Sequence, residues 1–116
     1  MRRQRAERGG RRAEAIAAWW LRLKGWTVLA QRARTPLGEV DLVVRRGQVL
    51  AFVEVKARAT PAQAERALDD FRLRRVAAAA EALAPRYARP GDTQRIDAIF
   101  ILPRRLPRHV PDVWRG

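Results

Sequence analysis

The chain has 116 residues, with 25 Lys or Arg and 12 Asp or Glu, and carries a formal net charge of +13. It contains no Cys, no Ser and a single His, which excludes thiolate zinc sites, multi-histidine metal cages and Ser-His-Asp or Cys-His nucleophilic machinery. A chain of this length can form one domain with its own core. Enzymatic chemistry would therefore have to rest on carboxylates, a hard cation and electrostatics.

The positive charge favours an acidic partner, and the phosphates of nucleic acid are the simplest one. All basic residues except Lys24 and Lys56 are Arg, so the charge alone is equally compatible with a plain preference for Arg. The sequence has no run of roughly 18 apolar residues, the length that a membrane span requires. We therefore expect a cytoplasmic protein without a membrane partner, and the sequence leaves a homodimer open.

The first segment, residues 1–12, is rich in Arg around the pair Gly9-Gly10. This composition predicts a mobile basic arm that contacts nucleic acid. The residues expected to make those contacts are Arg2, Arg3, Arg5, Arg8, Arg11 and Arg12. A well-buried helix is expected next, from about residue 13 to 24, and Gly25 supplies its stop signal.

The spacing of the apolar residues then changes to that of strands. A first strand is expected to begin at residues 27–29, a second to run over about 39–46, and a third over 49–57. The third of these segments is almost continuously apolar, as in a central strand covered on both faces. A capping-box pattern at Thr60 to Gln63 predicts a helix over about 61–84, with a break near Asp69-Asp70 and an end at Pro85. Its inward residues are expected to be Phe71, Val76, Ala79, Ala80 and Leu83.

A last buried strand is expected over 96–102, followed by a Pro-rich end that is irregular or forms an edge. Together the elements predict one α/β domain over residues 1–116, with a mixed sheet of four or five strands flanked by helices.

The sequence also predicts where several other polar and aromatic residues lie. On the last strand, Asp97 is expected to anchor an Arg or to support the site. His109 is expected at the surface, and Trp19, Trp20 and Trp26 in the core.

The hairpin between the second and third strands predicts where their acids meet. A two-residue turn at Gly47-Gln48 pairs Arg46 with Val49, because Gly suits the first position of a type II′ turn. The same register places Asp41 directly opposite Glu54, with Cβ atoms about 5 Å apart.

Two facing carboxylates repel by roughly 3 kcal/mol at an effective dielectric of about 20, so a divalent cation is expected between Asp41 and Glu54. Lys56 shares a face with Glu54, roughly 7 Å along the strand, and would lie beside the ion. The alternative is a plain ion pair of Asp41 or Glu54 with Lys56 or an Arg.

The segments Gly-Glu-Val-Asp-Leu at 38–42 and Phe-Val-Glu-Val-Lys at 52–56, preceded by a helix with Glu14, resemble the PD-(D/E)XK, restriction-endonuclease-like superfamily. More closely, the chain resembles the YraN-type family of small uncharacterised bacterial proteins. This resemblance implies a restriction-endonuclease-like core. By position it also implies that Asp41, Glu54 and the Val55 carbonyl bind Mg²⁺ or Mn²⁺, that Lys56 is the catalytic lysine, and that Glu14 is a helical acid of the active site.

Three positions depart from the family pattern. An Asn and an aromatic residue after the first strand appear as Arg32 and Ala33, and a Lys early in the second long helix appears as Arg72. These departures concern substrate contacts more than the metal site. For Glu14, a role at the start of the helix, near its dipole, is an equal alternative.

The sequence therefore predicts a metal-dependent nuclease that hydrolyses phosphodiester bonds in nucleic acid, with DNA favoured over RNA. No base-reading motif is visible, which favours selection by structure over selection by sequence. The alternative is a non-catalytic nucleic-acid-binding or adaptor module that retains the nuclease fold.

Overall fold

The computed structural model describes residues 2–114, with side chains from residue 10 to residue 114. Its sheet has five strands in the order β1-β2-β3-β4-β5, in which only the β3–β4 pair is parallel. The strands are β1 (Thr27–Thr35), β2 (Gly38–Arg46), β3 (Val49–Ala57), β4 (Thr93–Ile101) and β5 (Arg108–Val110). The helices are α1 (Arg2–Leu23), α2 (Pro61–Arg66) and α3 (Asp70–Tyr87). This arrangement confirms the predicted α/β class with a mixed sheet.

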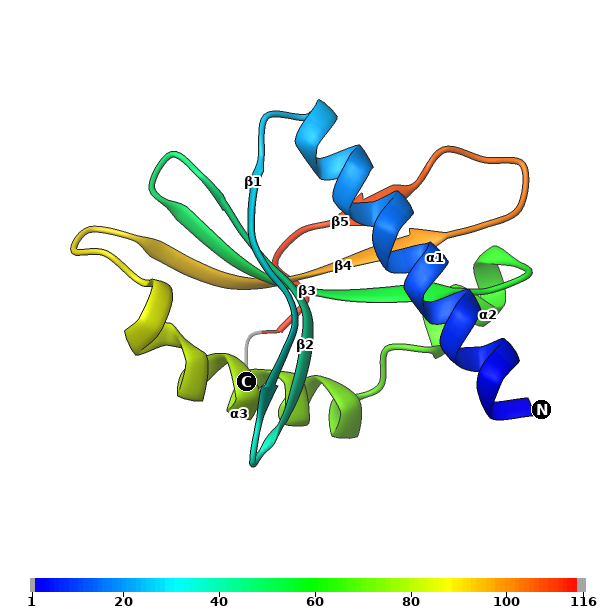
Figure 1. Cartoon of the computed structure of the whole chain (residues 1–116), viewed down its shortest axis with the longest axis horizontal. Helices are drawn as coiled ribbons and strands as arrows, with labels where there is room; N and C mark the ends of the chain where they lie inside the picture. Colours follow the sequence, from blue (N-terminus) through cyan, green and yellow to red (C-terminus); the bar gives the residue numbers. More distant parts are fainter. Residues whose placement is uncertain (1, 115–116) are drawn as a thin grey trace.

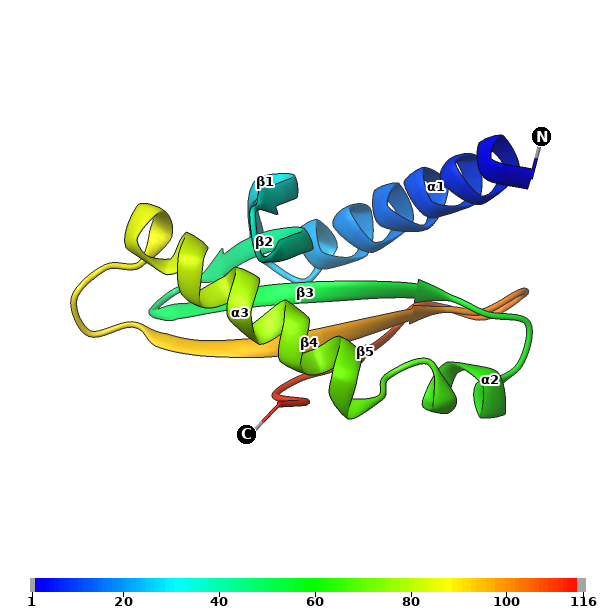
Figure 2. The ribbon, with the colours of Figure 1, turned by 90° about the horizontal axis from the view of Figure 1, so that it is seen from below.

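The two long helices cover opposite faces of the sheet (Figures 1 and 2). Alternate residues of β3 divide the core: Val53 and Val55 pack on the side of α1, while Leu50 and Phe52 pack on the side of α3. The near-continuous apolar sequence of β3 follows from this burial on both faces.

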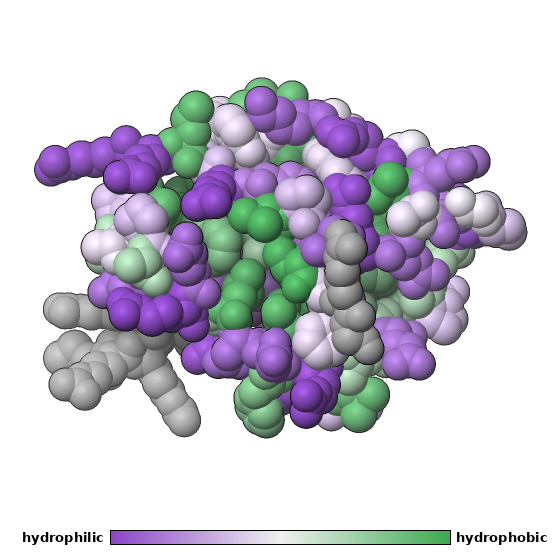
Figure 3. Space-filling view, turned by 180° about the vertical axis from the view of Figure 1, so that it is seen from behind, coloured by the Kyte–Doolittle hydropathy of each residue, from purple (hydrophilic) through white to green (hydrophobic). Residues whose placement is uncertain are grey.

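A third, smaller apolar cluster joins α2 to β4 and its neighbours, around Ala64, Ala98 and Phe100. Seen from the side on which β5 and α2 lie, apolar residues gather toward the centre of the surface and hydrophilic residues surround them (Figure 3). None of the helices in the described part of the chain is long and apolar enough to cross a membrane.

The structure confirms the predicted break between the second and third helices. Thr60 caps α2 by accepting a hydrogen bond of 3.2 Å from the Gln63 backbone N–H. Asp69 caps α3 in the same way, with a bond of 2.8 Å from the Arg72 N–H. Each helix therefore begins at its own N-cap residue; the cap at Thr60 was predicted from the sequence, whereas at Asp69 only a break was predicted.

The basic segment that we expected to be a mobile arm is instead helical, because α1 begins at Arg2. Two glycines cost a helix only about 1 kcal/mol each relative to Ala, and the Arg, Ala, Gln and Glu around them are good helix formers. The side chains of Arg2, Arg3, Arg5 and Arg8 lie outside the described residues. Arg11 and Arg12 are exposed.

The expectation that Pro85 ends the second long helix was wrong, since α3 continues through it to Tyr87. Pro85 has no N–H to donate to the helix. The last turn is nevertheless closed by a hydrogen bond of 2.7 Å from the Ala88 N–H to the Ala84 carbonyl. Phe71 is 68 % exposed rather than inward. At about 100° per residue it falls on the side of α3 opposite Ala80, outside the buried stripe.

The structure confirms some of the predictions for the other aromatic and polar residues and corrects others. Trp26 is buried as expected, whereas Trp19 is 53 % exposed. Asp97 is fully buried and anchors Arg95 through a bond of 2.9 Å. His109, expected at the surface, is half-buried: its Nε2 lies 2.7 Å from Asp97, and this contact joins β5 to β4. Although burial alone would raise the pKa of Asp97, the hydrogen bonds from His109 and Arg95 lower it.

A buried arginine holds the end of α3 against β2. The Arg45 guanidinium donates to both carboxylate oxygens of Asp92, at 2.8 and 2.6 Å, and to the Tyr87 carbonyl at 2.9 Å. The hydrogen bonds from Arg45 lower the pKa of Asp92 to about 2. The pair therefore stabilises the fold in its charged form.

Asp92→Asn should lower the melting temperature at neutral pH by more than Arg34→Gln, which breaks the exposed pair between Arg34 and Glu39. Because the folded pKa of Asp92 lies below its unfolded value, its contribution is full above about pH 4 and disappears as the pH falls toward 2. Thermal melts of the three proteins across this range check the expectation. Equal melting temperatures for the two variants at pH 7 would contradict it.

Candidate functional site

Strands β2 and β3 separate at Asp41. The predicted register is observed from Arg46 opposite Val49 to Leu42 opposite Val53, and it ends there. Asp41 Oδ2 then accepts a hydrogen bond of 2.8 Å from the Val55 backbone N–H. The expected pairing of Asp41 directly opposite Glu54 does not form. The Asp41 side chain accepts the hydrogen bond that a backbone carbonyl of the neighbouring strand would otherwise accept.

Three carboxylates gather where the strands part. Glu14 of α1 and Glu39 and Asp41 of β2 each offer an oxygen, and these oxygens lie within 4.8 Å of one another. Glu14 is only 8 % exposed and lies well inside α1, so the alternative that it serves the start of the helix was wrong. Glu39 was not among the expected ligands. Its signal in the sequence is the spacing of two residues from Asp41, which puts both on one face of a strand.

Glu54 and Lys56 form an ion pair on β3, with 2.8 Å between Oε1 and Nζ. Both line a cavity of about 230 Å³ together with Glu39 and two arginines of α3, Arg72 and Arg75. The ion-pair alternative is therefore realised for Glu54. Among the described side chains, no cation forms such a pair with Asp41.

The environment of Asp41 disfavours its charge. Burial and, next in size, the charge of Glu54 together raise the pKa of this carboxyl to about 7, although the hydrogen bond from the Val55 N–H acts to lower it. Close oxygen donors of this kind are the ligands that hard divalent cations prefer. The residues therefore fit a divalent cation, which would replace the proton on Asp41.

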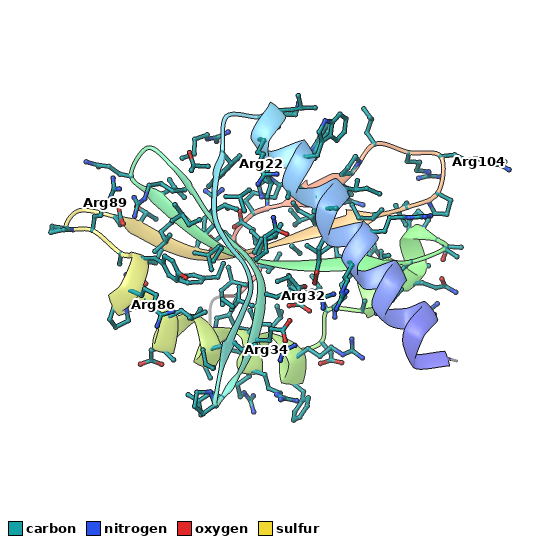
Figure 4. All side chains as sticks on the ribbon, viewed as in Figure 1. Arg22, Arg32, Arg34, Arg86, Arg89 and Arg104 are labelled. Atoms are coloured by element: carbon teal, nitrogen blue, oxygen red, sulfur yellow. The ribbon has the colours of Figure 1, made fainter. Side chains whose placement is uncertain are left out.

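Two arginines of β1 extend toward the acids (Figure 4). Arg32 Nε donates to Glu14 at 2.7 Å, and Arg34 lies 3.5 Å from Glu39. The Arg32 backbone has a φ of 52°, a left-handed conformation that is uncommon for Arg and well tolerated by Asn. Arg32 thus brings a guanidinium into the site.

Comparison with known proteins places the chain in a family. The uncharacterised protein family UPF0102 matches residues 13–101. The chain belongs to this family. It is 61 % identical to a UPF0102 protein of Sphingopyxis alaskensis and 56 % identical to one of Erythrobacter litoralis, in each case over 99 % of both chains. The predicted YraN-type relationship is confirmed.

Among solved structures, the fold resembles that of Hjc, a Holliday junction resolvase of Archaeoglobus fulgidus, with a TM-score of 0.62. The match covers 86 % of this chain and 73 % of the resolvase, at 19 % sequence identity. The chain thus shares the fold of this resolvase, which confirms the predicted restriction-endonuclease-like architecture.

The crowding of Asp41 predicts how its replacement affects stability in EDTA. Asp41→Asn keeps an oxygen that can accept the Val55 N–H and removes the half-buried charge. Because the folded pKa of Asp41 is raised, the wild type loses stability as the pH rises from about 4 to about 7, and the Asn variant does not. The variant should melt at an equal or higher temperature at pH 8, by a margin that shrinks toward pH 5. A melting temperature of the variant below that of the wild type at pH 8 would contradict the view that the surroundings of Asp41 disfavour its charge.

Proposed function

We propose that this UPF0102 protein is a metal-dependent nuclease that hydrolyses phosphodiester bonds in nucleic acid, in DNA rather than RNA, and selects substrates by structure. The observation that carries the proposal is the half-buried Asp41 carboxyl, held between the acids Glu14 and Glu39 and the Glu54–Lys56 pair. The shared fold supports it, since Hjc is named as a Holliday junction resolvase. The net charge of +13 suits a polyanionic substrate.

Mg²⁺ or Mn²⁺ would be held by Asp41, Glu54 and the Val55 carbonyl, with Glu14 or Glu39 as a further acid. Such an ion, when bound, supplies positive charge to the reacting phosphate and lowers the pKa of water. Oxygen ligands and the absence of Cys agree with a hard cation of this class.

Lys56 is the residue that we assign to the reacting groups. Its Nζ is held by Glu54 at 2.8 Å and faces the cavity, so it is placed to orient the attacking water or to contact a phosphate oxygen. Arg72 and Arg75 line the same cavity and would bind neighbouring phosphates as fixed positive charges. Hydrolysis would thus rely on electrostatics and positioning.

Cleavage assays test the proposed reaction. In Mg²⁺ or Mn²⁺ the protein should cleave at least one of branched, flapped, single-stranded and duplex DNA, and cleave the matching RNA less. Lys56→Arg keeps the charge but replaces a compact ammonium with a planar group that stays protonated, so cleavage should fall by roughly 10²-fold or more. Affinity for the same DNA in Ca²⁺ should change little.

Lys24→Arg is the matched control, because Lys24 is the other lysine and stacks on Trp20 away from the acids. It should cleave like the wild type. DNA binding without cleavage of any substrate would assign the protein to the non-catalytic class of binding modules. Near-normal cleavage by Lys56→Arg would make Lys56 a structural cation.

Metal binding has its own readout in thermal melts. Mn²⁺ at about a hundred times its dissociation constant should stabilise the fold by about 2.7 kcal/mol, a rise on the order of 10 °C for this size. Asp41→Asn should abolish the rise. Asp70→Asn, which removes an exposed carboxyl from the first turn of α3, should retain it. A melting temperature in the wild type that is independent of Mn²⁺ and Mg²⁺ would reject the site.

A further inference from the structure

A basic groove leads from the candidate site to the far ends of β3 and β4. The cavity that holds Lys56 shares Arg72 with a second hollow of about 450 Å³. The second hollow shares Arg58 with a third, of about 670 Å³, which the loop between β4 and β5 borders. Beyond Arg75 of the first cavity, the arginines that line this basic groove are Arg72, Arg66, Arg58, Arg12, Arg104 and Arg105.

Among the side chains that the structure describes, most of these arginines have no carboxylate partner. Arg72 lies 3.9 Å from Asp69, and none of the other five forms an ion pair with a carboxylate in the described part of the chain. The buried Arg45 and the half-buried Arg95, by contrast, are each paired with an Asp. Most of the positive charge along the groove is therefore not balanced by a carboxylate of the described structure, and an external anion would balance it.

The far end of the groove has a preset shape. The loop from Pro103 to Pro107 has a proline at each end, and Arg104 has a φ of 60°, a left-handed conformation that Arg seldom adopts. The Arg58 N–H donates to the Ile101 carbonyl at 3.1 Å, which fixes the end of β3 to the strand from which the loop departs. Arg58, Arg104 and Arg105 are therefore held around one hollow.

We propose that the basic groove is a second nucleic-acid-binding site, which holds the phosphate backbone of a duplex arm extending from the candidate site. As part of the substrate path, this assignment rests on the proposed nuclease function. Lys56 and Arg58 are two residues apart, or about 7 Å along an extended chain, so the groove begins beside the residue that we assign to the reacting groups.

The lining favours a duplex over a single strand. No aromatic side chain of the described residues lines the three hollows. Single-strand sites gain affinity by stacking bases on aromatic rings, whereas a duplex presents its phosphates and keeps its bases inside. Arginines without aromatic neighbours therefore suit the outside of a duplex arm.

Binding assays in EDTA test the groove without metal or cleavage. The probe is a labelled random-sequence DNA duplex with 5′-hydroxyl ends, so that no terminal phosphate contributes. The double variant Arg104→Gln, Arg105→Gln should weaken binding by on the order of 50-fold at 0.1 M salt and lower the salt slope by about 1.8. Arg12→Gln, on a different element, should lower the slope by about 0.9.

The matched control is Arg86→Gln, Arg89→Gln, which removes the same charge from two exposed arginines at the opposite end of the molecule (Figure 4). An equal loss of affinity in both double variants would overturn the groove, as would a wild type that does not bind the duplex at low salt. A larger loss with single-stranded than with duplex DNA would overturn the duplex assignment. If the groove variants bind DNA more weakly but the wild type cleaves nothing in Mn²⁺, only the nuclease proposal is contradicted. If the wild type cleaves and the groove variants bind DNA as tightly as the wild type does, only the groove proposal is contradicted.

Discussion

The hydrogen bond between Asp41 and the Val55 N–H is the constraint on which the candidate site depends. A buried N–H must have a partner, and where β2 stops pairing at Leu42, the Asp41 carboxylate supplies it. The strands part there, and the gap lets Glu14 approach from α1 while Glu54 lies on the side of α3. One carboxyl thus connects groups that belong to the two faces of the sheet.

The abundant arginines serve two physically different purposes. Inside the fold, Arg45, Arg95 and Arg32 each bind a carboxylate, and the planar guanidinium makes several hydrogen bonds at once. Along the basic groove, arginines such as Arg58 and Arg104 have no described carboxylate partner and keep their charge for an outside anion. The net charge reflects the second group, because in the first each Arg is balanced by an acid.

Local patterns predicted the fold well, and long-range contacts limited the site. The apolar run of β3 and the turn at Gly47 predicted a central strand and its register, because both signals lie within a few residues. The same register failed at Asp41, since extending it assumes that both strands continue to pair. His109 was misplaced for a similar reason: its contact with Asp97 joins residues that are distant in sequence. Glu39 was missed because the hairpin register identifies only residues that lie directly opposite each other on β2 and β3.

The distribution of charge in the site argues for a cation more strongly than the number of acids does. Glu54 has Lys56, Glu14 has Arg32 and Glu39 has Arg34, so each of these acids is balanced within the described structure. Asp41 differs, because its hydrogen bond comes from a neutral N–H that cannot cancel its charge. A proton or an external cation must do so, which agrees with its pKa of about 7. If the cluster served only to hold the strands together, an uncharged acceptor such as Asn would do so at lower cost. An Asp at this position is therefore better explained by cation binding than by a structural role.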